Sequence, residues 1–338
     1  MPANNSPKIT RTSWFGKDAV RLCTGAYEAL IVPEEGGNLI ELKNNLLKAN
    51  ILRTPSSIDK YDSAFLFGIP VLFPPNRIKE GKFTYRNKNY QFPVNETERG
   101  NHLHGFLYNQ KWTVSRETIT DTSCEVELSF IADKNTDFYK YFPHQFIIKL
   151  VHNLSKDGLH QTVQIINTGI STMPAGFGYH TTFNIPFNNK GNSKNCFLKL
   201  STDGRWELGK GMLPTGNNLG LNEWESAFRN KGVACMEHPF DTHYRKKSIS
   251  FKSMDFNGAI IEDTSAGLRL VYEAGNSFKH WMVYNGLEER KDFICPEPQT
   301  WLVNTPNIDM PAKVTGLIEL DPGKNWSDYT RIYVEKII

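Results

Sequence analysis

The chain has 338 residues, 39 of them basic and 36 acidic, so its formal net charge is 39 − 36 = +3. Charges this evenly balanced argue against nucleic acid or an anionic membrane surface as a partner. The five cysteines are odd in number and lack Cys-x-x-Cys spacing, which favours a reducing compartment over a disulfide framework. The polar N-terminus lacks the apolar stretch of a secretion signal, and no apolar run could cross a bilayer. We therefore expect a cytoplasmic protein.

Apolar residues alternate with polar ones along much of the chain, which predicts β-strands. We expect strands at residues 125–131, 145–151, 161–166, 248–251, 259–262, 268–272 and 331–334. Turn signals such as Asp157-Gly158 separate them. Residues 222–229 show a short helical pattern, in which Glu225 and Arg229 are expected to be exposed. Many short strands joined by Gly, Pro and Asn turns favour an all-β sandwich or barrel.

Nothing in the sequence divides the chain into two domains. Residues 184–195 are rich in Asn and Lys, but strand patterns resume on both sides, so we expect a long surface loop there. We expect one domain over residues 1–338, with about the first ten residues disordered.

One stretch near the N-terminal third places polar side chains at loop ends. Asn76 and Arg77 precede an expected short β-hairpin, and His104 follows it in a Leu-His-Gly turn. Arg, Asn and His side chains at loop ends can hydrogen-bond the hydroxyl groups of a neutral, polyhydroxylated ligand. This stretch therefore points to sugar chemistry.

Three further segments hold a titratable residue among Pro, Gly and aromatic neighbours: His180, Asp241 and Glu297. Glu297 lies between two prolines, which stiffen its backbone and hold its carboxylate in place. Partial desolvation there is expected to raise its pKa toward that of a useful general base. The segment around Asp241 is less distinctive, since Asp-Thr is also common in turns.

Taken together, these segments resemble the aldose 1-epimerase (galactose mutarotase-like) family over residues 36–334. The motifs that carry the resemblance are Asn76-Arg77-Ile78-x-x-Gly81-x-Phe83, Leu103-His104-Gly105, Tyr179-His180-Thr-Thr-Phe-Asn184 and Cys295-Pro-Glu297-Pro-Gln299. The resemblance implies a large antiparallel β-sandwich, or supersandwich, with the site in a cleft on one face.

The same resemblance implies an enzyme that interconverts the α and β anomers of a free sugar without metal or cofactor. Glu297 would take the proton of the C1 hydroxyl, and His180 would protonate the ring oxygen. General acid–base catalysis of this kind suits a carboxylate and an imidazole near neutral pH. The implied sugar-binding residues are Asn76, Arg77, His104 and Asp241.

Three positions depart from the family pattern: His102, Phe106 and Met282, the last of which stands where some relatives carry a sugar-binding Gln. These departures leave the identity of the sugar open. A small-molecule sugar is the expected partner, and the oligomeric state, monomer or homodimer, also stays open.

Three alternatives were weighed. A non-catalytic sugar-binding protein on the same fold would need Glu297 or His180 to be replaced. A hexose-phosphate epimerase would need basic residues beyond Arg77 to hold the phosphate. A cupin-type metal enzyme could use His102 and His104 on one strand face, but the downstream ligands of such a barrel are not evident.

Overall fold

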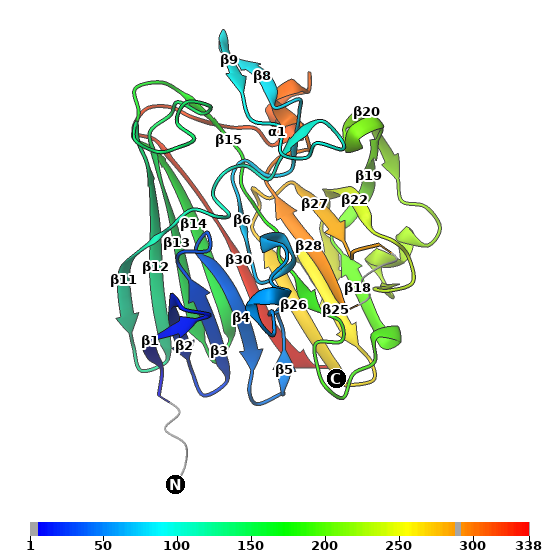
Figure 1. Cartoon of the computed structure of the whole chain (residues 1–338). Coiled ribbons are helices and arrows are strands. Elements are labelled where there is room, and N and C mark those ends of the chain that lie inside the picture. Colours follow the sequence, from blue (N-terminus) through cyan, green and yellow to red (C-terminus); the bar gives the residue numbers. More distant parts are fainter. Residues whose placement is uncertain (1–5, 288–291, 338) are drawn as a thin grey trace.

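The computed structural model describes residues 6–287 and 292–337, which form two main antiparallel sheets, a smaller five-stranded sheet and several two-stranded ladders (Figure 1). A five-stranded sheet is built from the N-terminal strands in chain order: β1 (Lys8–Trp14), β2 (Lys17–Cys23), β3 (Tyr27–Val32), β4 (Asn38–Asn44) and β5 (Ala49–Asn50). The predicted antiparallel all-β fold is confirmed. The expected pair of large sheets is present, and this smaller sheet is an addition to it.

The larger of the two main sheets has nine strands. In spatial order they are β11 (Thr113–Ile119), β12 (Ser123–Ala132), β13 (Phe146–Ser155), β14 (Gly158–Asn167), β30 (Asn325–Lys336), β26 (Leu268–Ala274), β25 (Gly258–Asp263), β18 (Cys196–Leu200) and β21 (Val233–Ala234). The C-terminal strand β30 thus lies in the middle, which ties the end of the chain into the core.

The second main sheet has eight strands and carries most of the site described below. In spatial order they are β20 (Pro214–Gly220), β19 (Thr202–Leu208), β22 (Asp241–Lys246), β27 (His280–Tyr284), β28 (Phe293–Gln299), β16 (Gly178–Tyr179) and β6 (Val71–Leu72), with β17 (Phe183–Asn184) also paired to β28.

The described residues also form four two-stranded antiparallel ladders. They are β7 (Arg77–Lys79) with β10 (Asn101–Leu103), β8 (Lys82–Tyr85) with β9 (Lys88–Gln91), β15 (Met173–Ala175) with β29 (Ile318–Leu320), and β23 (Ile249–Phe251) with β24 (Met254–Phe256). The hairpin β8–β9 is nested inside the β7–β10 pair, which confirms and extends the hairpin predicted between Pro74 and Gly105.

Alternating burial explains why these sequences form sheets. On β13 every second residue is buried, including Phe146, Ile148 and Leu150, as expected for a strand with one face on a core. In Figure 1 the blue strands β1–β4 lie across the green strands of the nine-stranded sheet, and β3 contacts β13. The nine-stranded sheet also meets the eight-stranded sheet, where a ring of β26 contacts a ring of β27. Between those two strands the rings of Tyr272 and Trp281 lie 6.1 Å apart.

Helical structure is sparse in the described chain. It comprises the 3₁₀ turns η1 (Ile58–Lys60), η2 (Ala64–Leu66), η3 (Ser193–Asn195), η4 (Lys210–Met212), η5 (Glu225–Arg229) and η6 (Thr305–Asn307), and the α-helix α1 (Ala312–Thr315). None of the helices formed by the described residues is both long and apolar enough to span a membrane.

Most local predictions agree with the structure, and two need correction. Each of the seven predicted strands overlaps an observed strand, and residues 184–195 join β17 to β18. The helix predicted at 222–229 is only the 3₁₀ turn η5, and Glu225 in it is buried because it accepts hydrogen bonds from Tyr244 and Arg205. Disorder over the first ten residues is wrong for residues 8–10, which begin β1, while residues 1–5 lie outside the described residues.

Candidate active site

A cavity of about 300 Å³ opens at the eight-stranded sheet. Its lining includes all six residues singled out from the sequence: Asn76, Arg77, His104, His180, Asp241 and Glu297. They come from segments more than 200 residues apart in the chain, and the fold brings them to one place. A larger hollow of about 650 Å³ lies between η5 and β18 and contains none of them.

A row of side chains across three neighbouring strands includes two that line the cavity, Met282 and Glu297. Met282 of β27 lies directly opposite Glu297 of β28 on one side and His243 of β22 on the other. Asp241, the first residue of β22, faces Tyr284 in the next such row. Because side chains two residues apart share a face of a strand, Asp241 and His243 project from the same side of β22.

The two prolines beside Glu297 coincide with a break in the sheet. β28 pairs with β16 only at Gln299, and with β17 only at Phe293 and Ile294. Between those points Pro296 and Pro298 have no amide N–H to give to a ladder. His180 belongs to the segment that crosses this gap between β16 and β17, and its own amide bonds to the Pro70 carbonyl at 3.0 Å instead.

His180 and Glu297 are in direct contact. The His180 Nε2 atom lies 3.2 Å from Oε1 of Glu297, and the Glu297 side chain is only 1% exposed. The other carboxylate oxygen, Oε2, accepts a 3.1 Å hydrogen bond from the Gln299 amide. The Gln299 side-chain oxygen in turn accepts a 3.2 Å hydrogen bond from the Asn76 side-chain amide. The carboxylate is therefore fixed from two directions.

Burial shifts the protonation of this pair. It raises the pKa of the Glu297 carboxyl well above its ordinary range, and the nearby Asp241 carboxylate adds to the rise, while the Gln299 hydrogen bond and Arg77 oppose it. Burial also lowers the pKa of the His180 imidazole from 6.5 to about 4. At pH values between the lowered pKa of His180 and the raised pKa of Glu297, the two side chains together hold one proton, and they titrate as a unit.

His104 approaches the same pair through ring contacts. Its ring centroid lies 5.4 Å from that of His180, and Phe65 packs against both imidazoles at 4.6 and 5.9 Å. His104 has a left-handed backbone (φ 65°), and so has Gly105 (φ 70°). A Cβ on Gly105 would lie 2.0 Å from the Phe73 carbonyl oxygen, so the Leu-His-Gly turn requires glycine at its end.

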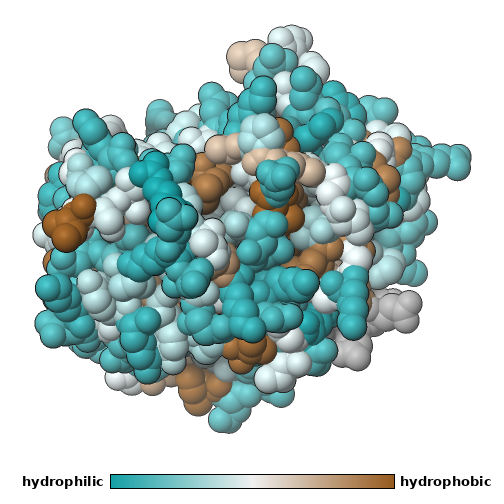
Figure 2. All heavy atoms as spheres, turned by 90° about the horizontal axis from the view of Figure 1, so that it is seen from above, coloured by the Kyte–Doolittle hydropathy of each residue, from teal (hydrophilic) through white to brown (hydrophobic). Residues whose placement is uncertain are grey.

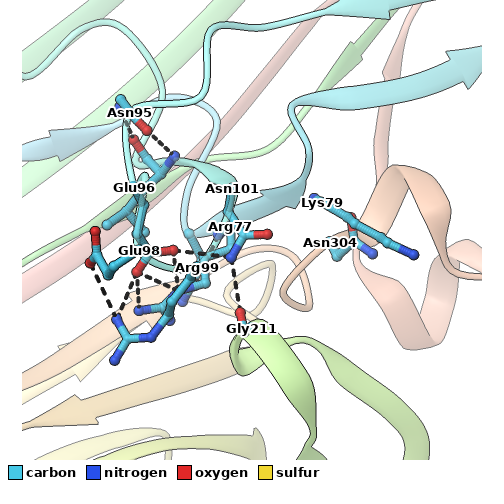
Figure 3. Close-up of polar contacts among 11 residues, drawn as sticks. Arg77, Lys79, Asn95, Glu96, Glu98, Arg99, Asn101, Gly211 and Asn304 are labelled. Carbon is cyan, nitrogen blue, oxygen red and sulfur yellow. Dashed lines mark hydrogen bonds and ion pairs between the residues drawn. The ribbon is translucent and has the colours of Figure 1, made fainter.

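Arg77 is held by a carboxylate that the sequence did not single out (Figure 3). Its Nε and Nη2 atoms donate to Glu96 at 2.9–3.0 Å, and Arg99 donates to the same carboxylate at 2.8 Å. Glu96 and Arg99 both line the cavity, as does Phe65. Nothing in an isolated Asn-Glu-Thr-Glu-Arg sequence distinguishes these residues from a solvated turn, so only the fold identifies them.

The three positions that depart from the family pattern line two different hollows. Met282 lines the cavity, whereas His102 and Phe106 line a separate hollow of about 340 Å³. The His102 Nδ1 atom lies 2.8 Å from the Pro93 carbonyl oxygen, so His102 and His104 do not converge on one point. Among the described residues no three His, Cys, Asp or Glu side chains are grouped to hold a metal ion.

The sequence matches the family described as "Aldose 1-epimerase" over residues 18–333. A galactose mutarotase-like protein from Clostridium acetobutylicum is 37% identical and superposes with a TM-score of 0.95, covering 98% of this chain and 100% of that one. A galactose 1-epimerase from Lactobacillus acidophilus NCFM is 15% identical with a TM-score of 0.74, covering 98% and 99% of the two chains, so it shares the fold.

A curated relative is also similar in sequence. The uncharacterized protein YihR of Escherichia coli (strain K12) is 31% identical over 175 residues. That similarity spans about half of each protein, 51% of this chain and 52% of YihR.

Proposed function

This chain belongs to the aldose 1-epimerase family, and on that premise we propose that it is a mutarotase that interconverts the α and β anomers of a free sugar. The observation that carries the proposal is the 3.2 Å contact between His180 and Glu297 at the base of a cavity lined by hydroxyl-binding side chains. A volume of about 300 Å³ is at the lower end of small-molecule sites, which suits a monosaccharide.

The closeness of the two groups matches the chemistry. In a cyclic sugar the C1 hydroxyl oxygen and the ring oxygen are bonded to the same carbon, so the base and the acid must act on two oxygens that lie close together. Glu297 would accept the C1 hydroxyl proton while His180 donates a proton to the ring oxygen, and the bond between C1 and the ring oxygen would break. Rotation about C1–C2 and the reverse step would close the ring with the opposite configuration at C1.

The protons balance across each half of this reaction. Ring opening starts from the form of the pair in which His180 carries the shared proton. It moves one proton from the sugar to Glu297 and one from His180 to the sugar, so the pair holds one proton before and after. Ring closure restores the starting arrangement by the same route in reverse. The single proton that the pair retains between its two pKa limits is therefore the number that the reaction requires.

Polarimetry of freshly dissolved α-anomers tests the proposal. We expect the wild-type protein to speed the equilibration of at least one monosaccharide in a panel of hexoses, pentoses and deoxy sugars. Glu297→Gln and His180→Asn should each slow it by about 10²–10⁴-fold, the usual contribution of a general acid or base. Glu319→Gln, the same chemical change at an exposed position, serves as the matched control.

One outcome would replace the proposal with another. If no sugar in the panel equilibrates faster than in buffer, but calorimetry detects binding that Arg77→Met weakens, the protein is a non-catalytic sugar-binding protein on this fold. Retention of full activity in Glu297→Gln would overturn the assignment of the base.

A further inference from the structure

One buried carboxylate binds both arginines found among the described residues that line the cavity. Glu96 is 4% exposed and accepts hydrogen bonds from Arg77, Arg99 and Asn101 (Figure 3). The Arg77 contact is bidentate, with Nε and Nη2 both donating at 2.9–3.0 Å. Charge-assisted pairs of this geometry are strong and directional, so the Arg77 guanidinium is fixed in orientation.

The carboxylate is itself held on a tight turn. Residues 96–100 connect Asn95 to β10, and the amides of Gly100 and Asn101 donate to the Glu96 carbonyl at 2.8 and 3.2 Å. Asn101 also donates from its side chain to Glu96 at 3.1 Å and to the Gly211 carbonyl at 2.9 Å. The turn that supplies Glu96 and Arg99 is thereby tied to the neighbouring η4 segment.

This arrangement leaves specific donors for a ligand. The hydrogen bonds of Arg77 to described residues use Nε and Nη2, and Nη1 remains for the cavity that Arg77 lines. Arg99 uses Nη1 for Glu96. Both arginines act on the Asp241 carboxyl: burial is the largest influence on its pKa and raises it, while Arg77 and Arg99 each lower it.

The charge of the lining disfavours an anionic ligand. Among the described residues of the lining, Arg77 and Arg99 stand against three acidic residues, Glu96, Glu98 and Asp241. The His180–Glu297 pair with its single proton is neutral overall, so the formal sum is 2 − 3 = −1. A phosphate or carboxylate group is usually bound by arginines whose charge is not already taken by a protein carboxylate. Here Glu96 competes for both.

We propose that Glu96 is a specificity-determining and positioning residue, which orients Arg77 toward a sugar hydroxyl and makes the cavity reject sugars that carry an anionic group. This inference rests on the proposed sugar-binding function of the cavity. Glu96 would then be the residue by which the cavity distinguishes free sugars from sugar phosphates. Removing the Glu96 charge while keeping its shape would release two arginines to an anion.

The test is Glu96→Gln, with inorganic phosphate as the probe in isothermal titration calorimetry. We expect the wild-type protein to bind phosphate at least about tenfold more weakly than Glu96→Gln, because hydrogen bonds from a released guanidinium to an anion are charge-assisted. Adding Arg99→Gln to Glu96→Gln should remove most of the gain. Glu98→Gln is the matched control, since Glu98 is 68% exposed and lies 4.0 Å from Arg99, and it should gain little.

A second readout separates positioning from folding. For any neutral sugar that the wild-type protein equilibrates, Glu96→Gln should raise KM by about tenfold with a smaller change in kcat, and Glu96→Asp should recover part of the loss. Phosphate binding does not depend on mutarotation, so a protein without mutarotase activity would refute the proposed function and leave this test intact.

Two results would overturn the inference. The first is equal phosphate affinity of the wild type and of folded Glu96→Gln. The second can be measured even if Glu96→Gln does not fold: phosphate binding by the wild-type protein that is lost in Arg99→Gln would show that Glu96 does not withhold the arginines from an anion.

Discussion

The Gln299 side chain donates a 3.1 Å hydrogen bond to Oε2 of Glu297, two residues before it on β28. The Gln299 side-chain oxygen also accepts a hydrogen bond from the Asn76 side chain at 3.2 Å, and the Asn76 Oδ1 atom accepts the Arg77 backbone N–H at 2.9 Å. The proposed base is thus connected through one amide to the segment that supplies the proposed sugar-binding residues Asn76 and Arg77. Orientation of the carboxylate and its pKa depend on the same contact.

The pH dependence of activity should reflect the shared proton of His180 and Glu297. As pH falls toward about 4, His180 gains a proton and both groups are protonated, which leaves no base. As pH rises through the elevated pKa of Glu297, the pair loses its last proton and no acid remains. We expect a bell-shaped profile of kcat/KM by polarimetry. An acid limb near pH 6.5, the ordinary value for histidine, would contradict this assignment.

Gln299→Met should move the basic limb of that profile upward. The Gln299 hydrogen bond lowers the pKa of Glu297, so its removal raises the pKa, by about one unit for a hydrogen bond to a buried charge. We also expect kcat to fall, because the carboxylate loses one of its two fixed contacts. Gln164→Met, at the surface of β14, is the control. An unchanged basic limb would show that Gln299 does not act on the carboxylate.

Asp241→Asn should move the same limb in the opposite direction. The Asp241 charge raises the pKa of Glu297, and a neutral amide of the same shape removes that repulsion, so the pair loses its last proton at a lower pH. KM should rise as well if Asp241 binds the sugar. The basic limb is thus expected to move up in Gln299→Met and down in Asp241→Asn. If it moves in the same direction in both variants, these two side chains do not set the pKa of Glu297 as described.

The sequence predicts the proposed catalytic residues more completely than the residues that surround the proposed sugar-binding side chains. His180 and Glu297 stand in motifs with unusual neighbours, and the cavity contains both. Glu96 and Arg99 were not foreseen because their role depends on β7 pairing with β10, a contact that places Glu96 against Arg77. Short-range patterns cannot show which charged residue of a polar turn will be buried.

The sequence predicts several long strands of the fold but not its two-residue ones. Alternation identified the long strands such as β12 and β13, whose one face is buried. It did not identify two-residue strands such as β16, because so short a segment has no period to detect. Glu225 was expected at the surface, and its burial depends on Tyr244 and Arg205 from two other strands.

Gly105→Ala should destabilise the protein and disturb His104. The new Cβ would lie 2.0 Å from the Phe73 carbonyl oxygen at a φ of 70°, so the turn must shift in addition to bearing left-handed strain of about 1 kcal/mol. Gly100→Ala is a close control, because its φ is also 70° but no atom lies within 4 Å of the added Cβ. The difference between the urea midpoints of the two variants therefore measures the loss of stability caused by the steric clash alone. Equal losses would show that the Phe73 contact is relieved easily.

Buried histidines should make the protein sensitive to acid, and His152 offers the cleanest case. It is 2% exposed on β13, and burial lowers its pKa from 6.5 to about 4. The unfolded chain therefore binds more protons than the folded protein between these values, so the free energy of unfolding falls as pH drops from 6.5 toward 4. From pH 7 to 4.5 the titration of this residue alone would lower the free energy of unfolding by about 2 kcal/mol.

His152→Asn removes that titration while keeping a polar group for Gln161, whose amide lies 3.2 Å from His152 Nδ1. Urea unfolding at pH 7 and pH 4.5 should show a smaller loss of stability in the variant than in the wild type, even if the variant is less stable at pH 7. His160→Asn, at an exposed position of the neighbouring strand β14, should reduce the loss much less. If His152→Asn loses as much stability as the wild type over this pH range, His152 is not held neutral by burial, and the acid sensitivity must come from other groups.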